Sequence, residues 1–161
     1  MPIRIVNDIA ELVNNDFSKY VVETILETNF KEIGITLDPE EITKFVRSFI
    51  EEDHKICIID EEDGRVVALL LAEYGKFNFS KDLVANQTFV RVNEEYRGRN
   101  IYREMFNVFF KWAKERGCII VTAGVHDYTT IDQDKVRASF EWMGFKLFSV
   151  DYFIEVKNVR W

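Results

Sequence analysis

The stretch EEYRGRNIYREMF, residues 94–106, places two arginines around a single glycine just before a segment with helical periodicity. The apolar side chains of that segment recur at the spacing that buries one face of a helix, namely Ile101, Met105, Val108, Phe109 and Trp112. The preceding run NQTFVRV, residues 86–92, has the composition of a strand. Gly117 is placed to end the helix. The stretch is therefore predicted to join a strand to an amphipathic helix.

Such a junction has two interpretations. The first turn of a helix carries backbone N–H groups without internal partners and the positive end of the helix dipole, so it suits a phosphate. Gly98 permits a close approach of the backbone, and the guanidinium groups of Arg97 and Arg99 suit phosphate oxygens. The alternative is a solvated turn that happens to be basic. On this segment alone, both interpretations stay open.

Before the junction, the pattern predicts a short strand, two helices and a β-hairpin. The strand is IRIV at residues 3–6, and the first helix follows it, broken or kinked at residues 14–16. The second helix begins at LDPEE, where Asp38 is the N-cap, a proline takes the first helical position and Glu41 completes a capping box. The hairpin strands KICIID and RVVALLLAEY flank the turn signal EEDG within residues 55–74.

After the junction, the pattern predicts a strand, a helix and two closing strands. CIIVTAGV at residues 118–125 has the continuous apolar character of a covered strand, and the next helix ends at Gly144. FKLFSV at 145–150 and YFIEV at 152–156 are the closing strands. The strand–helix–strand order calls for a right-handed crossover and a parallel pair, whereas the hairpin is antiparallel. The predicted fold class is α/β, with a mixed, mostly antiparallel central sheet and helices on both faces.

The composition favours one soluble domain spanning residues 1–161. Its 21 basic and 28 acidic residues give a net charge of −7, which disfavours nucleic acid and anionic membranes as partners and favours cationic ones such as amines or basic peptides. The longest apolar run, VVALLLA, is too short to span a bilayer. Cys57 and Cys118 lie in apolar runs without metal-ligand spacing, so we expect no metal site and a reduced, cytoplasmic protein.

In this order of elements, the chain resembles the GNAT-type N-acetyltransferases along essentially its whole length. That family places a loop of pattern Arg/Gln-x-x-Gly-x-Gly/Ala between a strand and a helix, and the backbone amides of the loop bind the pyrophosphate of acetyl-coenzyme A. The matching residues here are Arg97, Gly98, Arg99, Asn100, Ile101 and Tyr102, after an entry VNEEYRG that is similar to the family's V-x-x-x-Y-R-G. The tail ASFEWMGFKLFSVDYFIEV and the hairpin DEEDGRVVALLLAEY also resemble family segments. The resemblance implies a GNAT-like acyl-CoA N-acyltransferase fold, in which the parallel pair splays apart.

The resemblance also implies how the rest of the cofactor is bound. Backbone groups of the strand would pair with the pantetheine amides and polarise the thioester carbonyl, at Phe89, Val90, Arg91 and Val92. Two residues depart from the loop pattern, because Asn100 replaces a glycine and Tyr102 replaces a small residue. Asparagine tolerates unusual backbone angles. Tyr102 either shapes the pantetheine path or narrows the pocket.

The family's usual acid and base are absent from their expected positions. The strand at 86–92 holds no carboxylate, and Gln87 can hold a water but cannot take a proton. Phe140 stands four residues before the Gly-Phe turn, where the family often has a tyrosine. The substitutes are His126 as base and Tyr128 as acid, in the run HDYTT. The alternative for this run is a polar loop that caps the next helix.

Two functions follow from the sequence. The first is an acetyl-coenzyme A-dependent N-acetyltransferase acting on a primary amine of a small molecule or a peptide. The second is a catalytically silent GNAT-fold binding module that holds coenzyme A without turnover, which Gln87, Phe140 and Tyr102 motivate. Beside these two, a third function is an interaction protein that uses exposed phenylalanines such as those of YGKFNFS at 74–80. Three other uses of this stretch stay open: a partly buried loop, a lid over the acceptor site, or an edge used in forming a homodimer.

Overall fold

A computed structural model of the chain describes residues 3–13, 15–124, 132–149, 154 and 156–159. The strands in this part are β1 (Arg4–Val6), β2 (Lys55–Glu62), β3 (Arg65–Lys76), β4 (Leu83–Val92) and β5 (Cys118–Thr122). The α-helices are α1 (Ile9–Val13), α2 (Asn15–Leu26), α3 (Pro39–Glu51), α4 (Ile101–Glu115) and α5 (Gln133–Trp142). Single 3₁₀ turns are η1 (Asn29–Ile33), η2 (Glu94–Tyr96) and η3 (Val156–Asn158). None of the described helices has the length and apolar character needed to cross a bilayer.

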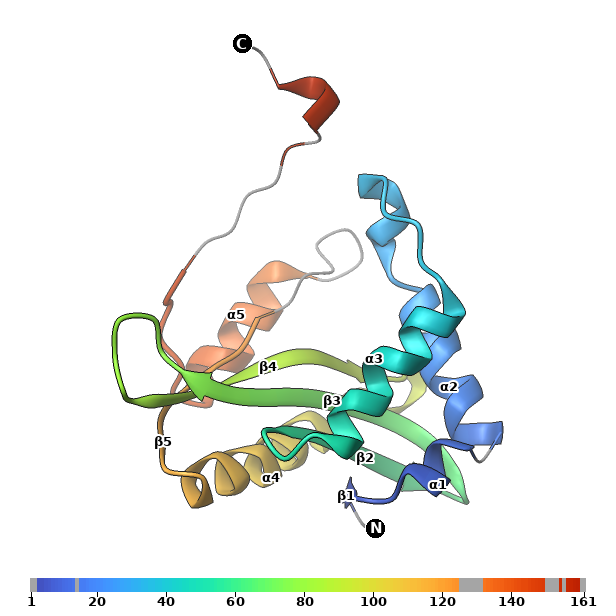
Figure 1. Cartoon of the computed structure of the whole chain (residues 1–161), viewed down its shortest axis with the longest axis horizontal. Helices are drawn as coiled ribbons and strands as arrows, with labels where there is room; N and C mark the ends of the chain where they lie inside the picture. The colour runs from blue at the N-terminus through green and yellow to red at the C-terminus, as the bar shows by residue number, and fades with distance from the viewer. Residues whose placement is uncertain (1–2, 14, 125–131, 150–153, 155, 160–161) are drawn as a thin grey trace.

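The strands form one mixed sheet in the order β1-β2-β3-β4-β5 (Figure 1). Neighbours from β1 to β4 pair antiparallel, whereas β4 and β5 pair parallel on either side of the crossover helix α4. Asp63 and Gly64 connect β2 to β3 with φ of 51° and 75°, as a two-residue type I′ turn requires. The predicted mixed sheet, with its hairpin and its one parallel pair, is confirmed.

Each face of the sheet is covered by helices over a core of its own. α4 and α5 pack on one face, over buried residues that include Ile58 and Leu70. α1, α2 and α3 pack on the other face, over a second cluster that includes Leu69 and Leu71 (Figure 1). Successive residues of β3 therefore supply opposite cores, as the pleat of a strand requires. This burial on both faces explains why the sequence of β3 is a continuous apolar run.

The start of α3 shows one confirmed and one wrong detail of the prediction. The carboxylate of Asp38 accepts from the backbone N–H groups of Glu40 and Glu41, at 2.7 and 3.2 Å, so the predicted N-cap is confirmed. The side chain of Glu41 instead pairs with Lys44 at 2.9 Å. The predicted capping box is therefore wrong, because a lysine one turn ahead offers the carboxylate a full charge.

The two closing strands are wrong wherever the structure describes them. Residues 145–149 form no strand, residue 154 lies outside one, and Val156 begins η3, which lies apart from the sheet (Figure 1). An alternating apolar pattern becomes a strand only where a sheet edge pairs with it. In the described part of the chain β5 has one neighbour, β4. β5 is accordingly an edge strand with Ile119 63% exposed, rather than the covered strand predicted.

Candidate functional site

The junction between β4 and α4 has the strand–turn–helix form that the sequence predicted. β4 ends at Val92, η2 follows, and α4 begins at Ile101. Two residues of the turn have left-handed backbone angles, with φ of 86° at Gly98 and 63° at Asn100. Asparagine is among the few residues that adopt this conformation at low cost, which explains how it replaces a glycine here. Its side chain makes no capping hydrogen bond, so α4 begins without a side-chain cap.

The start of α4 carries unpaired backbone N–H groups. The N–H of Glu104 donates to the carbonyl of Asn100 at 3.0 Å, which is the first helical hydrogen bond. Within the described part of the chain, no group accepts from the N–H groups of residues 98–103. A Cβ atom on Gly98 would meet no atom within 4 Å, so the space before the helix is open. Free donors at the positive end of a helix dipole, facing open space, fit a pyrophosphate.

Both arginines of the turn already have partners. The Nε of Arg97 donates to the carbonyl of Val92 at 3.1 Å, which ties the turn to the end of β4. The Nη1 of Arg99 donates to both carboxylate oxygens of Glu62, at 3.2 and 3.1 Å. Its guanidinium also lies 4.8 Å from the centre of the Tyr96 ring. Arg99 is thus not the free cation expected from the sequence, which carried no signal for a partner 37 residues away.

β4 and β5 separate part-way along β4. Their parallel pairing ends where Asn86 faces Thr122, although β4 continues to Val92. A bulge at Thr88 bends β4 just past this point. Residues 89–92 remain paired to β3, and their other backbone edge has no partner among the described residues. This opening leaves an unpaired strand edge, a form of backbone that can pair with an extended ligand bearing amide groups.

The side chains of residues 89–92 point away from this edge. Val90 and Val92 pack against the core beneath α4, and Phe89 packs against the opposite core. The guanidinium of Arg91 bonds to the carboxylate of Glu27 in the segment after α2, at 3.0 Å. The backbone of this strand segment, rather than its side chains, is therefore what a ligand can reach at the opening.

Two amide side chains fasten the strands at the point of separation. The hydroxyl of Thr122 donates to Oδ1 of Asn86 at 2.8 Å. The backbone N–H of Gly124 donates to Oε1 of Gln87 at 3.2 Å. Gln87 is only 4% exposed, and its NH₂ group has no acceptor among the described residues. The structure thus places an amide hydrogen-bond donor beside the opening, and an amide cannot serve there as a base.

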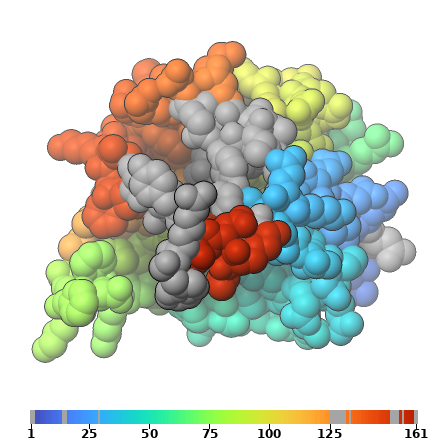
Figure 2. All heavy atoms as spheres, turned by 90° about the horizontal axis from the view of Figure 1, so that it is seen from above, coloured from blue at the N-terminus to red at the C-terminus, as the bar shows by residue number. Residues whose placement is uncertain are grey.

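Tyr102 and Phe140 meet in an aromatic cluster between α4 and α5. Their ring centres lie 6.1 Å apart, and the Tyr102 ring also lies 4.8 Å from that of Phe106. Figure 2 shows α5, in orange, beside the yellow segment that leads into α4. Burial raises the pKa of the Tyr102 hydroxyl well above its ordinary value. Tyr102 therefore packs α4 against α5, and the phenyl ring of Phe140 brings no proton donor.

The predicted base and acid, His126 and Tyr128, lie outside the described residues. The other histidine, His54, lies 3.5 Å from the carboxylate of Glu52 and packs edge-on against the Tyr74 ring at 6.5 Å. His54 precedes β2, whose first residue pairs with Glu73 near the end of β3. Because the junction follows the end of β4, this histidine lies at the opposite end of the strands from the junction.

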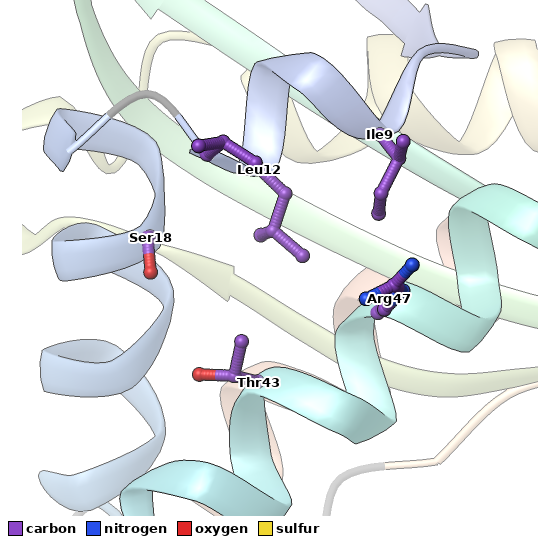
Figure 3. A pocket seen from close by; sticks show the side chains of 6 residues that line it. Ile9, Leu12, Ser18, Thr43 and Arg47 are labelled. Carbon is purple, nitrogen blue, oxygen red and sulfur yellow. The ribbon is translucent and has the colours of Figure 1, made fainter.

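Two of the hollows on the described surface bear on the search for a site. One of about 230 Å³ lies between α1, α2 and α3 (Figure 3). It is lined by Ile9, Leu12, Val13, Ser18, Thr43 and Arg47. These helices cover the face of the sheet opposite α4, so this hollow does not adjoin the junction. The other, of about 200 Å³, lies at the start of α4 and includes Arg99.

Comparison with known proteins shows the family. Residues 19–145 match the acetyltransferase (GNAT) family, which uses acetyl-coenzyme A as its acetyl donor. No match was found among curated protein sequences. Among solved structures, a transcriptional regulator from Bacillus halodurans C-125 has a TM-score of 0.73 at 16% identity, covering 96% of this chain and 99% of that one.

Two N-acetyltransferases of known structure share the fold. Glucosamine-6-phosphate N-acetyltransferase from Arabidopsis thaliana has a TM-score of 0.67 at 16% identity, covering 97% and 99% of the two chains. The aminoglycoside N-acetyltransferase AAC(6')-Iy, solved with coenzyme A, has a TM-score of 0.64 at 16% identity, covering 96% and 98%. The family match extends over most of the sequence, from within α2 to Phe145, three residues after the end of α5. The chain belongs to the GNAT acetyltransferase family.

Proposed function

We propose that the protein is an acetyl-coenzyme A-dependent N-acetyltransferase that acetylates a primary amine of a small molecule or a peptide. The observation that carries this proposal is the open start of α4, where the unpaired N–H groups of residues 98–103 follow directly on the unpaired edge of β4. A pyrophosphate joined to an amide-containing arm needs these two kinds of site side by side. The family to which the chain belongs uses a cofactor of this form.

The cofactor would be held mainly through the backbone. The residues that would hold the pyrophosphate are Arg97, Gly98, Arg99, Asn100, Ile101 and Tyr102. The residues whose backbone edge would pair with the pantetheine arm are Phe89, Val90, Arg91 and Val92. When bound, acetyl-coenzyme A supplies a thioester, in which the new C–N bond to the amine replaces the C–S bond. A backbone N–H of β4 would donate to the thioester carbonyl and so polarise it. The NH₂ group of Gln87 offers a second donor or holds a water.

Two protons must also move, one from the attacking amine and one to the departing sulfur. Neither Gln87 nor Phe140 can exchange a proton. We assign the base to His126 and the acid to Tyr128, because both follow β5 in the sequence and β5 is the strand that separates from β4. His126→Ala is expected to lower kcat at neutral pH and to remove the rise in rate near the ordinary histidine pKa. An unchanged rate and pH profile would take His126 out of the mechanism.

The acceptor is proposed to be a cationic amine. The net charge of −7 favours such a partner over an anionic one. Two of the similar structures carry names of enzymes that acetylate amines, an aminoglycoside in one and glucosamine-6-phosphate in the other. Both cysteines are free, and burial raises the pKa of the Cys57 thiol, as suits a protein of the reducing cytoplasm.

The proposed pyrophosphate site at residues 97–102 can be tested by a matched pair of substitutions at Gly98. Asparagine and aspartate have nearly the same shape and both tolerate the left-handed backbone, so Gly98→Asn controls for the side chain and the strain. Gly98→Asp adds a negative charge facing the phosphates, and we expect it to weaken acetyl-coenzyme A binding by roughly tenfold more than Gly98→Asn. Calorimetric titration measures both. Equal affinities of the two variants for acetyl-coenzyme A would refute the proposed pyrophosphate site.

Turnover is tested separately, by following thiol release from acetyl-coenzyme A with a panel of primary amines. Acetylation of at least one amine supports the enzyme. Cofactor binding with no thiol release across the panel would instead support a silent coenzyme A-binding module. Absence of cofactor binding at millimolar concentration would exclude both functions.

A further inference from the structure

The hollow at the start of α4 is lined by an excess of acidic side chains. Its volume is about 200 Å³, and its walls are Asp60 and Glu62 at the end of β2 with Arg99, Ile101 and Glu104 at the start of α4. Three carboxylates against one guanidinium leave two formal negative charges in excess. Arg99 lies at 3.1 Å from Glu62, whereas Glu104 has no ion pair with a described residue. The hollow therefore has more acceptors than its own residues can satisfy.

Asp60 is the residue that sets this hollow apart from an ordinary acidic surface. Alternate residues of β2 face the core beneath α4, and Ile56 and Ile58 are two of them. Asp60 is the next residue on that face, where an apolar side chain would be expected. It is only 3% exposed, and its Oδ1 has no hydrogen-bond partner among the described residues. Burying a carboxylate oxygen without a donor is costly, and native proteins rarely leave one so.

The surroundings of Asp60 increase this cost. Desolvation raises the pKa of its carboxyl, a hydrogen bond from the Glu61 backbone lowers this pKa in part, and the negative charge of Glu104 raises it further. The register of β2 against β3 shifts between Asp60 and Glu61, because Val67 of β3 is an extra residue opposite them. A bulge re-aims side chains and is common beside functional sites. The unmatched oxygen, the second carboxylate and the local irregularity together point to a missing cationic donor.

We propose that this hollow binds a small primary alkylammonium or diammonium cation, with one ammonium group donating to Asp60 and Glu104. An ammonium carries three N–H donors and a full charge, which is what the two carboxylates lack. At about 30 Å³ for each water, the hollow has room for roughly seven waters or a short alkyl chain. Ile101 offers that chain an apolar contact. The described carboxylates do not form a cluster suited to a metal ion.

Occupation of the hollow is linked to the cofactor site through Arg99, an extension that rests on the proposed function. Glu62 holds the Arg99 guanidinium on the hollow's side of the turn. A cation in the hollow competes for Glu62 and releases Arg99 toward a phosphate at the start of α4. Amine and acetyl-coenzyme A then strengthen each other's binding by the same factor, because coupling between two sites is reciprocal.

The direct test uses the full chain without cofactor, titrated with 1,4-diaminobutane at neutral pH and followed by calorimetry and amide NMR shifts. We expect saturable one-to-one binding, with shifts at the end of β2 and the start of α4.

Asp60→Asn should weaken the binding of 1,4-diaminobutane at least tenfold. Asp63→Asn is the matched control, since it removes the same charge from the same hairpin at a left-handed position that asparagine tolerates, and should leave affinity unchanged.

Tetramethylammonium is compared with methylammonium, because both carry one positive charge and only methylammonium has N–H donors. Tetramethylammonium should bind at least tenfold more weakly than methylammonium. The site is refuted if Asp60→Asn binds the diamine like the natural protein, or if tetramethylammonium binds as tightly as methylammonium. Circular dichroism checks that Asp60→Asn is folded. If it is not, Glu104→Gln takes its place, with the same expected loss.

The coupling is tested by measuring the acetyl-coenzyme A Kd with and without saturating diamine. We expect saturating diamine to lower the acetyl-coenzyme A Kd several-fold, and we expect the Asp60→Asn variant to show no such change. An unchanged Kd would refute the coupling while leaving the cation site, which stands on the cofactor-free titration. Failure of acetyl-coenzyme A to bind under any condition would refute the proposed function instead, so the two failures are distinguishable.

Discussion

At the scale of single residues, Asn100 shows how the loop departs from its family pattern without losing its shape. Its φ of 63° lies in the left-handed region, where asparagine costs little and β-branched residues cost more. We expect Asn100→Gly to leave the free energy of unfolding within about 0.5 kcal/mol of the natural value, and Asn100→Val to lower it by about 1–2 kcal/mol. Urea unfolding measures both. Equal stability of the two variants would contradict the left-handed assignment.

Asp60 is expected to make stability depend on pH in a direction unusual for a carboxylate. Its folded-state pKa is raised, so the folded protein binds a proton more tightly than the unfolded chain does. The resulting stabilisation is present below the unfolded pKa near 3.8 and is lost as pH rises through the folded pKa. The negative charges of Glu104 and Glu62 also raise this pKa, whereas the hydrogen bond from the Glu61 backbone lowers it.

Asp60→Asn removes this titration, so the variant should gain stability relative to the natural protein between acid and neutral pH. The gain amounts to about 1.4 kcal/mol for each unit by which the folded pKa is raised. Urea unfolding of both proteins at a series of pH values measures it. A difference in stability that stays constant across that range would show that Asp60 has an ordinary pKa.

At the scale of elements, α4 was the best predicted part of the chain, with one instructive error. Its bounds and the glycine that ends it follow from periodicity and capping. The buried stripe is rotated slightly from the expected one, since Phe106 is fully buried and Val108 only half-buried. The rotation follows from packing against α5, whose Phe140 meets Phe106 at 6.2 Å between ring centres. Periodicity within one helix cannot show where its neighbour lies.

The same helix offers a graded test of the core. Phe109 is fully buried and packs against Phe106 and Trp112, so Phe109→Ala should lower the free energy of unfolding by about 3–5 kcal/mol. Val108→Ala, at the adjacent half-buried position, should cost only about 1 kcal/mol. Denaturant unfolding of the two variants gives the comparison. Similar losses would place the helix in a different rotation about its axis.

At the scale of the whole molecule, sequence patterns within and between neighbouring elements predicted most of the elements and their pairing. They did not predict side-chain contacts between residues far apart in the sequence. The sequence led to the mixed sheet because hairpin and crossover rules act between neighbouring elements. It gave no sign that Glu62 would hold Arg99, or that Gln87 would accept from Gly124, because each pair joins residues 37 apart through the folded sheet. The closing strands were wrong for a related reason, since their pattern alone could not tell whether the edge of β5 would pair with them.

The net charge of −7 acts on the two proposed substrates in opposite directions. A cationic amine is attracted to the molecule at long range, whereas the phosphates of acetyl-coenzyme A are repelled except at the local donors of residues 98–103. Raising the ionic strength from about 0.05 M to about 0.3 M shortens the screening length to below roughly 10 Å. We therefore expect kcat/KM for a dicationic amine to fall several-fold, and that for a monocationic amine of the same length to fall less. Steady-state rates at saturating acetyl-coenzyme A measure both. Equal dependence on salt for the two amines would mean that the acceptor site draws its substrate through local contacts alone, and that the acidic surface plays no part in selecting cations.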